Sequence, residues 1–238
     1  MRELATTLTE ALLDPILARE PSAPRITHYD DATGARIELS GLTLANWAAK
    51  TANFVRDEFV LTPGARIAVL LPAHWQTAAV LLGAWWAGAE VVLHADPDAE
   101  LALVTPDGLD AVTDVPEVAV LSLDAFGRPV PDLPIGVTDY ASSVRVHGDQ
   151  FHPGGAGLAL DGATVAEVLA AAKASAAEQG FAPGDRVLST AHWSTPSDLI
   201  AGLLSVFVIG GSLVQVTNED PATRGRRIET ERVASLRG

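Results

Sequence analysis

Apolar positions recur at helical spacing in some stretches of the chain and form short unbroken runs in others. From residue 44 to residue 55 they recur every third or fourth position, which predicts an amphipathic helix that Thr43 can cap. The run RIAVLLP at 66–72 is typical of a buried parallel strand. A second helix over 74–88 and a strand EVVLH follow. This order predicts a β-α-β unit preceded by a helix.

The same patterns continue through the rest of the chain. The clearest helix lies at 162–180, where Thr164 and Glu167 form a capping box and Gly180 is a stop signal. A helix is expected near the N-terminus over 4–19, followed by a hairpin with strands at 26–31 and 36–40. Further expected strands lie at 101–105, 118–123, 186–190 and 212–216, and further helices at 108–115 and 196–209.

A sequence repeat relates two parts of the chain. Residues 59–67 read FVLTPGARI and residues 181–187 read FAPGDRV, and Ala-His-Trp follows each of them, at 73–75 and at 191–193. The repeated order predicts two related α-β units in which RIAVLLP and RVLST are equivalent parallel strands. The expected fold class is therefore α/β, with mostly parallel sheets flanked by helices.

The chain is long enough, with 238 residues of which 48% are hydrophobic, to bury a substantial core. We expect residues 1–97 to form a first α/β unit with an N-terminal helix, 98–150 a connecting α/β segment, and 151–238 a second α/β unit. The five arginines within 218–238 are expected on a solvated basic helix at the C-terminus.

The composition excludes several classes of function. A formal net charge of −14 repels phosphate backbones and argues against binding of nucleic acid. No apolar run reaches the length of a membrane span, and the first residues lack the features of a signal peptide, so no membrane contact and a cytoplasmic location are expected. The absence of cysteine excludes disulfides, thiol nucleophiles and zinc–thiolate sites.

Residues 147–162, HGDQFHPGGAGLALDG, hold the most varied candidate chemistry. Backbone N–H groups at Gly154, Gly155 and Gly157 can point at an anion, and the helix that Thr164 caps would add the positive end of its dipole. The alternative is a glycine-rich turn that binds nothing, which is common between strands.

A phosphate site in this loop would also need a cation to neutralise its ligand. Lys50 and Lys173 are the only lysines, and both fall within predicted helices. Arg145 is the only nearby basic residue along the sequence. The pattern therefore favours a loop that has the glycines of a phosphate site and lacks the positive charge that such a site needs.

The same loop offers His147, Asp149 and His152 as candidate metal or ligand contacts, and His94 with Asp96 forms a second pair. Histidine and carboxylate side chains suit zinc, and a catalytic zinc site needs three of them. Their spacing matches no ligand motif, so we expect no metal here. A serine hydrolase is not indicated either, because no G-x-S-x-G occurs.

Two adjacent tryptophans, Trp85 and Trp86, fall in the second predicted helix. Neighbouring positions on a helix point about 100° apart, so both side chains cannot face the same core. We expect one of them to contact a partner or another part of the fold. The two residues are therefore candidate interface residues.

The order of elements resembles the N-terminal domain of adenylate-forming enzymes: acyl-CoA synthetases, peptide-synthetase adenylation domains and luciferases. The resemblance covers residues 27–238 and is most specific at 42–97. There a Leu-Thr start, Pro-Gly-x-Arg-Ile, a strand ending in Leu-Pro, and Ala-Gly-Ala before Asp-Pro occur in order. The chain also resembles short stand-alone relatives of these enzymes.

The resemblance implies a phosphate loop rich in Ser, Thr and Gly that ends in Lys-Pro-Lys-Gly, at the place of residues 147–162. No lysine occurs in that stretch. The family's later motifs, which hold adenine, metal and ribose and supply a catalytic lysine, would lie beyond residue 238. We therefore expect a remodelled loop where the relatives hold ATP.

Three hypotheses on function follow. The first is a non-catalytic relative of AMP-forming acyl-CoA synthetases that binds a ligand or a protein and uses no cofactor. The second is an acid ligase that binds ATP or AMP with Mg²⁺ and a carboxylic acid, with its missing parts supplied by another chain. The third is a structural interaction protein. An exposed apolar face would make a homodimer or a hetero-complex.

Overall fold

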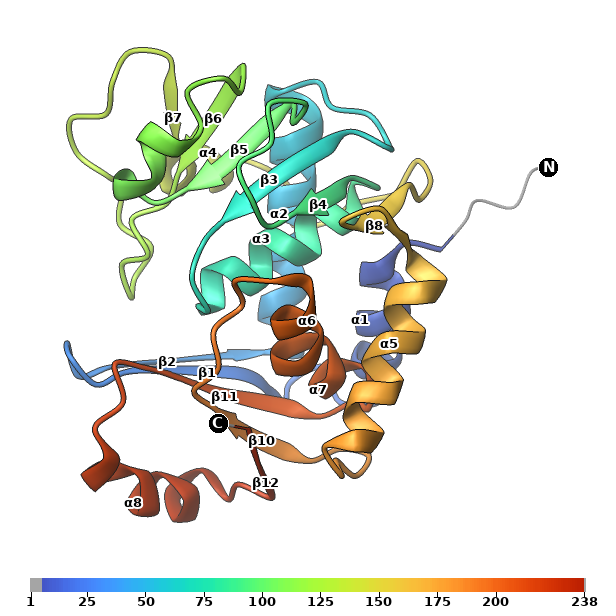
Figure 1. Ribbon diagram of the computed structural model, residues 1–238, viewed down its shortest axis with the longest axis vertical. Coiled ribbons are helices and arrows are strands. Elements are labelled where there is room, and N and C mark those ends of the chain that lie inside the picture. Colours follow the sequence, from blue (N-terminus) through green and yellow to red (C-terminus); the bar gives the residue numbers. More distant parts are fainter. Residues whose placement is uncertain (1–5, 238) are drawn as a thin grey trace. The chain divides into compact units, whose positions relative to one another are not determined.

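The structure is a computed structural model that describes residues 6–237 (Figure 1). Their contacts group them into two compact units. Unit 1 comprises the described residues up to Ala11, Ala45–Leu71 and Ala79–Val165, and unit 2 comprises Leu12–Leu44, Pro72–Ala78 and Ala166 onward. Each unit contains one β-sheet.

The sheet of unit 1 has seven strands in the order β7-β6-β5-β3-β4-β8-β9. All neighbouring strands in it are parallel except β8 and β9. The strands are β3 (Arg66–Leu70), β4 (Glu90–Val92), β5 (Leu101–Val104), β6 (Glu117–Val120), β7 (Val137–Asp139), β8 (Leu158–Leu160) and β9 (Ala163–Thr164).

The sheet of unit 2 has five strands in the order β12-β10-β11-β1-β2. Only the pair β1 and β2 is antiparallel, as the predicted hairpin requires. The strands are β1 (Pro24–Asp30), β2 (Ala35–Ser40), β10 (Arg186–Ser189), β11 (Ser212–Thr217) and β12 (Ser235–Arg237).

Helices connect the strands of both sheets. They are α1 (Leu8–Arg19), α2 (Gly41–Glu58), α3 (Trp75–Trp86), a 3₁₀ helix η1 (Pro106–Ala111), α4 (Tyr140–Val144), α5 (Val165–Glu178), α6 (Pro196–Leu199), a π-helix η2 (Ile200–Leu204), α7 (Ser205–Val208) and α8 (Pro221–Glu231). Within the described residues, no helix is both long enough and apolar enough to cross a membrane.

The core of each unit forms against its sheet because the parallel strands are apolar on both faces. In unit 1, alanines and valines of β3, β5 and β6 pack together with Leu109 of η1. In unit 2, Leu188, Val214 and Val216 pack against Ile228 of α8. Figure 1 shows α8 on one side of this sheet and α6 and α7 on the other.

The α/β fold class and the predicted strands are confirmed. Both RIAVLLP and RVLST form parallel strands, β3 and β10, as the repeat predicted. That the two units superpose stays a prediction. So does the expected division at residues 97 and 150, although the segment 98–150 adds β5, β6 and β7 to the sheet that contains β3.

Several local expectations are corrected by hydrogen bonding. Ser40, not Thr43, caps α2, because the Ser40 hydroxyl accepts the Thr43 N–H at 3.1 Å. The helix expected at 108–115 is a short 3₁₀ turn. The helix expected at 196–209 is interrupted by the π-turn η2, which follows a start capped by Thr195.

Among the described residues, four helices end in the same way. At Gly88, Gly180 and Gly210 a residue with positive φ ends the helix, and the N–H of the next residue bonds to the carbonyl five residues back. Glycine suits this left-handed position because it has no Cβ. Helix α8 makes the same ending with Arg232, at φ 52°.

Candidate functional site

The glycine-rich loop of unit 1 packs directly on two other turns. The carbonyl oxygen of Gly88 accepts the N–H of Gly64 at 2.9 Å and that of Gly157 at 3.2 Å. A Cβ on Gly157 would lie 2.8 Å from the Gly88 oxygen and 2.9 Å from the Gly64 Cα. Gly157 is therefore required by the close approach of three backbone segments.

The other two candidate glycines have different surroundings. Gly155 has φ 144°, a conformation that favours glycine, and its carbonyl would lie 2.4 Å from a Cβ on Gly88. Gly154 has only an ordinary contact of 3.5 Å with Pro63. Two of the three glycines thus serve the packing of the loop, and the Gly157 N–H is already bonded within the protein.

Helix α2 holds the start of this loop. The Lys50 ammonium donates to the His147 carbonyl at 2.6 Å. The Asn53 amide donates to the carbonyls of Gly148 and Gln150, each at 2.9 Å. The expectation that no lysine lies at the loop is therefore wrong. Lys50 is separated from His147 by 97 residues and reaches it only because the chain folds back.

Arg56 is a second cation beside the loop, and its guanidinium lies 5.1 Å from the centre of the Phe151 ring. Its charge is already paired, since it bonds Asp57 at 2.7 and 3.0 Å and the Asn53 side chain at 2.7 Å. Hydrogen bonding to Asp57 raises the pKa of Arg56. Lys50 has the more available charge of the two.

The candidate metal ligands are not brought together. The His147 Nε2 lies 2.9 Å from a carboxylate oxygen of Glu58, while Asp149 and His152 are exposed. His94 lies 3.9 Å from Asp161. In residues 6–237, no group of three or more histidine and carboxylate side chains is placed to hold a metal ion.

The remaining candidates lie in unit 1. Thr164 is exposed in β9, paired with Leu158 of β8. Trp85 is 2% exposed, and its Nε1–H donates to the Ala159 carbonyl at 2.6 Å. Trp86 is partly exposed, with its ring centre 6.1 Å from that of Phe151. Trp85 therefore faces inward and Trp86 toward the surface.

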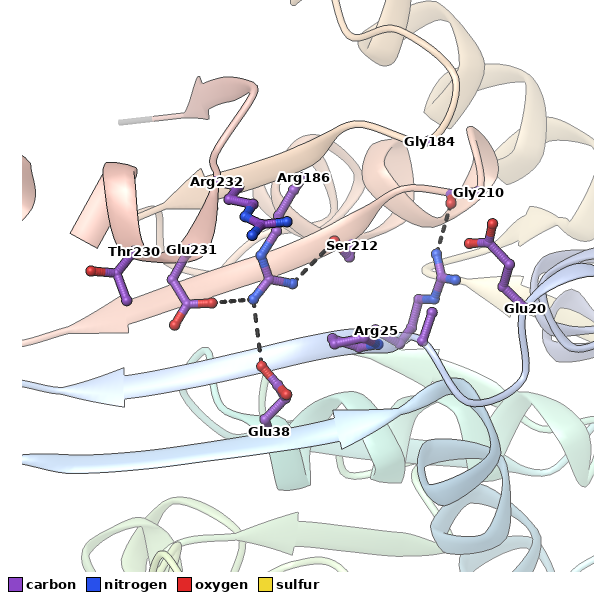
Figure 2. A pocket seen from close by; sticks show the side chains of 12 residues that line it. Glu20, Arg25, Glu38, Gly184, Arg186, Gly210, Ser212, Thr230, Glu231 and Arg232 are labelled. Atoms are coloured by element: carbon purple, nitrogen blue, oxygen red, sulfur yellow. Dashed lines mark hydrogen bonds and ion pairs between the residues drawn. The ribbon is translucent and has the colours of Figure 1, made fainter. Parts of the chain in front are cut away.

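Unit 2 contains a cavity of about 350 Å³ that none of the sequence patterns indicated (Figure 2). It lies where β1, β10 and β11 begin and where α8 ends. Its lining is rich in arginine and glutamate side chains. The lining residues are Glu20, Ala23, Pro24, Arg25, Glu38, Gly184, Arg186, Gly210, Ser212, Thr230, Glu231 and Arg232.

Glu231 is the centre of an ion-pair network at one end of the cavity. Its carboxylate accepts hydrogen bonds from the Tyr29 hydroxyl, from Arg36 at 3.0 Å and from Arg186. Burial alone would raise the pKa of Glu231, but these donors outweigh it and lower the pKa. Glu38 adds a second carboxylate, 2.7 Å from Arg36 and 3.5 Å from Arg186.

Arg25 occupies the other end and has no carboxylate within 4 Å in the described part of the chain. Its side chain is buried, and one terminal nitrogen donates to the carbonyls of Gly210, at 2.7 Å, and Gly211. The Nε has no hydrogen-bond partner among these residues. Burial lowers the pKa of Arg25, and the charge of Glu20 partly offsets that effect.

A pair of buried histidines lies elsewhere in unit 2. The rings of His28 and His74 are 4.3 Å apart, edge to face. His74 Nδ1 accepts the Gln76 N–H at 3.1 Å, so that nitrogen carries no proton, and His28 Nε2 lies 3.2 Å from the Thr217 hydroxyl. Burial lowers the pKa of His28 to about 4 and that of His74 to about 3.

Comparison with known proteins finds a similar chain and similar folds. A TIGR03089 family protein of Mycobacterium tuberculosis is 57% identical over 239 residues, which cover 97% of this chain and 98% of that protein. No protein-family model matches.

Among solved structures, Brucella canis acyl-CoA synthetase has a TM-score of 0.79 at 19% identity and covers 97% of this chain. The N-terminal domain of FACL13 from Mycobacterium tuberculosis has a TM-score of 0.68 at 17% identity and covers 96%. This chain spans 47% of the first structure and 61% of the second. Its fold is that of the N-terminal part of acyl-CoA synthetases, as the resemblance implied.

Proposed function

The chain belongs to the TIGR03089 family, and we propose that it is a ligand-binding protein that does not form acyl adenylates. The observation that carries this proposal is the bonding of the Gly157 N–H to the Gly88 carbonyl. A backbone donor used in this way is not available to a phosphate group. The role of the loop is therefore structural: it packs on two other turns of unit 1.

The chemistry of adenylation supports the same conclusion. A carboxylate attacks the α-phosphate, so two anions react and negative charge gathers on the phosphate oxygens. Removal of one well-placed donor from such a site typically lowers the rate about 100- to 1000-fold. Of the two cations that reach the loop in the described residues, Arg56 is paired with Asp57, and Lys50 is bonded to the His147 carbonyl. Lys50 alone would have to neutralise the phosphates of ATP, which supports weak or absent binding of ATP with Mg²⁺.

Thermal unfolding in the presence of nucleotides tests the proposal. A ligand that binds only the native state raises the melting temperature by mass action, with about 2.7 kcal/mol of stabilisation at a concentration 100 times its Kd. We expect no shift with ATP and Mg²⁺, with AMP, or with a non-hydrolysable acyl-adenylate mimic. Saturable stabilisation by any of them, lost on a change within residues 147–162, would overturn the proposal.

An acid ligase completed by another chain is the second candidate function, and Lys50 favours it. The Lys50 ammonium donates one hydrogen bond to the His147 carbonyl and has two further N–H groups to offer. The Lys50→Met variant separates the two candidates. If Lys50 only holds the loop, the variant loses stability and ATP has no effect on either protein. If ATP stabilises the natural chain and not the variant, the ligase function gains support.

A homodimer or hetero-complex remains part of the proposal. Phe126 and Ile135, both in the connection between β6 and β7, are among the large apolar side chains that are exposed. Burial of such side chains contributes about 25 cal/mol per Å². Sedimentation velocity at increasing concentration is the test, and a monomer at all concentrations with no partner recovered would contradict it.

A further inference from the structure

We propose that the cavity of unit 2 binds the phosphate group of a small molecule through Arg25 and Arg232, an inference that rests on the ligand-binding function proposed above. The site lies at the ends where β1, β10 and β11 begin, and it uses no residue of the 147–162 loop. Its ligand is therefore independent of any nucleotide bound at that loop.

The charges around the cavity favour an anion. The lining itself holds three guanidinium groups and three carboxylates, and its ion-pair partners Arg19 and Arg36 add two further positive charges. The groups are Arg19, Arg25, Arg36, Arg186 and Arg232, with Glu20, Glu38 and Glu231. A phosphate monoester carries about −1.5 to −2 at neutral pH, which matches these two further charges. The chain as a whole has the opposite sign, −14.

Arg25 is the group that most needs a counter-charge. It is 3% exposed, yet its only acceptors in the described residues are two backbone carbonyls, and its Nε has none. A buried charge without a counter-ion is unfavourable, and arginine presents its donors in a planar fork that matches a phosphate group. A phosphate in the cavity would supply the missing partner.

Arg232 supplies an independent observation. It takes the left-handed position at the end of α8 that glycine takes at three other helices, with φ 52°. Residues kept in such conformations cluster at functional sites. Within residues 6–237 the side chain makes no hydrogen bond or ion pair, and Figure 2 shows its guanidinium pointing toward Arg186.

Hydroxyl groups complete the site. The Ser212 oxygen accepts a hydrogen bond from Arg186 at 3.2 Å, so its own hydrogen can be donated to a ligand, and Thr230 adds a second hydroxyl in the lining. The volume of about 350 Å³ lies at the lower end of the range for small-molecule sites. The cavity has room for an organic group attached to the phosphate.

Isothermal titration calorimetry of the full chain tests the site, with inorganic phosphate and glycerol 2-phosphate as probes at equal ionic strength. We expect saturable binding of glycerol 2-phosphate at one site. Tighter binding of this ester than of inorganic phosphate would indicate an organic phosphate as ligand, and equal binding would indicate the phosphate group alone. Malonate at the same concentration is the control for a carboxylate site and should bind more weakly than either.

The matched variants are Arg232→Gln and Arg226→Gln, which remove the same charge. Arg226 is exposed on α8 and does not line the cavity. We expect about tenfold weaker binding for Arg232→Gln, as the loss of one charge-assisted hydrogen bond implies, and no change for Arg226→Gln. Arg232→Gly should also bind about tenfold more weakly and yet unfold at a higher temperature, because glycine relieves the backbone. Weaker binding by a variant that unfolds at a higher temperature would show that the loss of binding is not caused by unfolding.

Three results would overturn the inference: no saturable binding of either phosphate, equal weakening in Arg232→Gln and Arg226→Gln, or tighter binding of malonate. None of them would restore adenylation. Conversely, nucleotide binding at the loop would overturn the proposed function and leave a bound phosphate in the cavity unaffected.

Discussion

The Gly157 N–H donates a hydrogen bond of 3.2 Å to the Gly88 carbonyl, an oxygen that also accepts the Gly64 N–H. A Cβ at residue 157 would overlap this oxygen and the Gly64 backbone. We therefore expect Gly157→Ala to lower the free energy of unfolding by about 1–3 kcal/mol, the usual cost of overpacking. Urea unfolding measures this change.

The matched control for that substitution lies three residues earlier. A Cβ on Gly154 would make an ordinary 3.5 Å contact with Pro63. Gly154→Ala should therefore change the free energy of unfolding by less than about 0.5 kcal/mol. Equal effects of the two substitutions would show that the three turns do not pack as described.

The two adjacent tryptophans allow a second paired test. The Trp85 Nε1–H donates to the Ala159 carbonyl at 2.6 Å, and Trp85→Phe would leave that buried carbonyl without this donor. Such a loss costs about 1–3 kcal/mol. The Trp86 Nε1 is buried and has no partner within residues 6–237, so Trp86→Phe should be neutral or stabilising. Thermal and urea unfolding distinguish the two, and a larger loss for Trp86→Phe would contradict the assignment of Trp85 as the inward-facing residue.

The histidine pair predicts a loss of stability at mildly acidic pH. Burial lowers the pKa of His28 from 6.5 to about 4 and that of His74 from 6.5 to about 3. At a pH below 6.5 and above these folded-state values, the unfolded chain therefore binds more protons than the folded chain. The free energy of unfolding should be unaffected by these groups above pH 6.5. It should fall as the pH drops below 6.5, by up to about 1.4 kcal/mol per pH unit for each histidine.

The double variant His28→Gln with His74→Asn is the control for this pH dependence. Glutamine can keep the contact with Thr217, and asparagine can keep an acceptor for the Gln76 N–H. Between pH 6.5 and 4.5 the stability of the double variant should fall less than that of the natural chain, with the remaining loss due to carboxylates such as Glu231, whose pKa is lowered in the folded state. An unchanged slope would show that other groups cause the loss.

The sequence predicted the strands and helix ends that local residue patterns determine. The strands β3 and β10 follow from short apolar runs, and Gly88, Gly180 and Gly210 were visible as helix ends because only glycine takes that position readily. The ending at Arg232 gave no such signal, since arginine is not expected in a left-handed conformation.

The residues of the candidate sites were less predictable, because long-range folding brings them together. Lys50 meets His147 across 97 residues, and Arg25 meets Gly210 across 185. The cavity draws on strand beginnings and a helix end that lie far apart along the chain. No spacing rule relates such positions. The glycines at 154–157 were recognised as special, but packing and ligand binding give the same sequence pattern.

Pyrophosphate release from ATP by the purified chain is the most direct test of its function. The assay should include Mg²⁺ and a panel of fatty, aryl and amino acids, with an active acyl-CoA synthetase as a positive control. We expect release at the background rate with every acid, because the Gly157 N–H is bonded to Gly88 and Arg56 beside the loop is paired with Asp57. Release that depends on the added acid and is abolished in Lys50→Met would contradict this and assign the chain as a ligase.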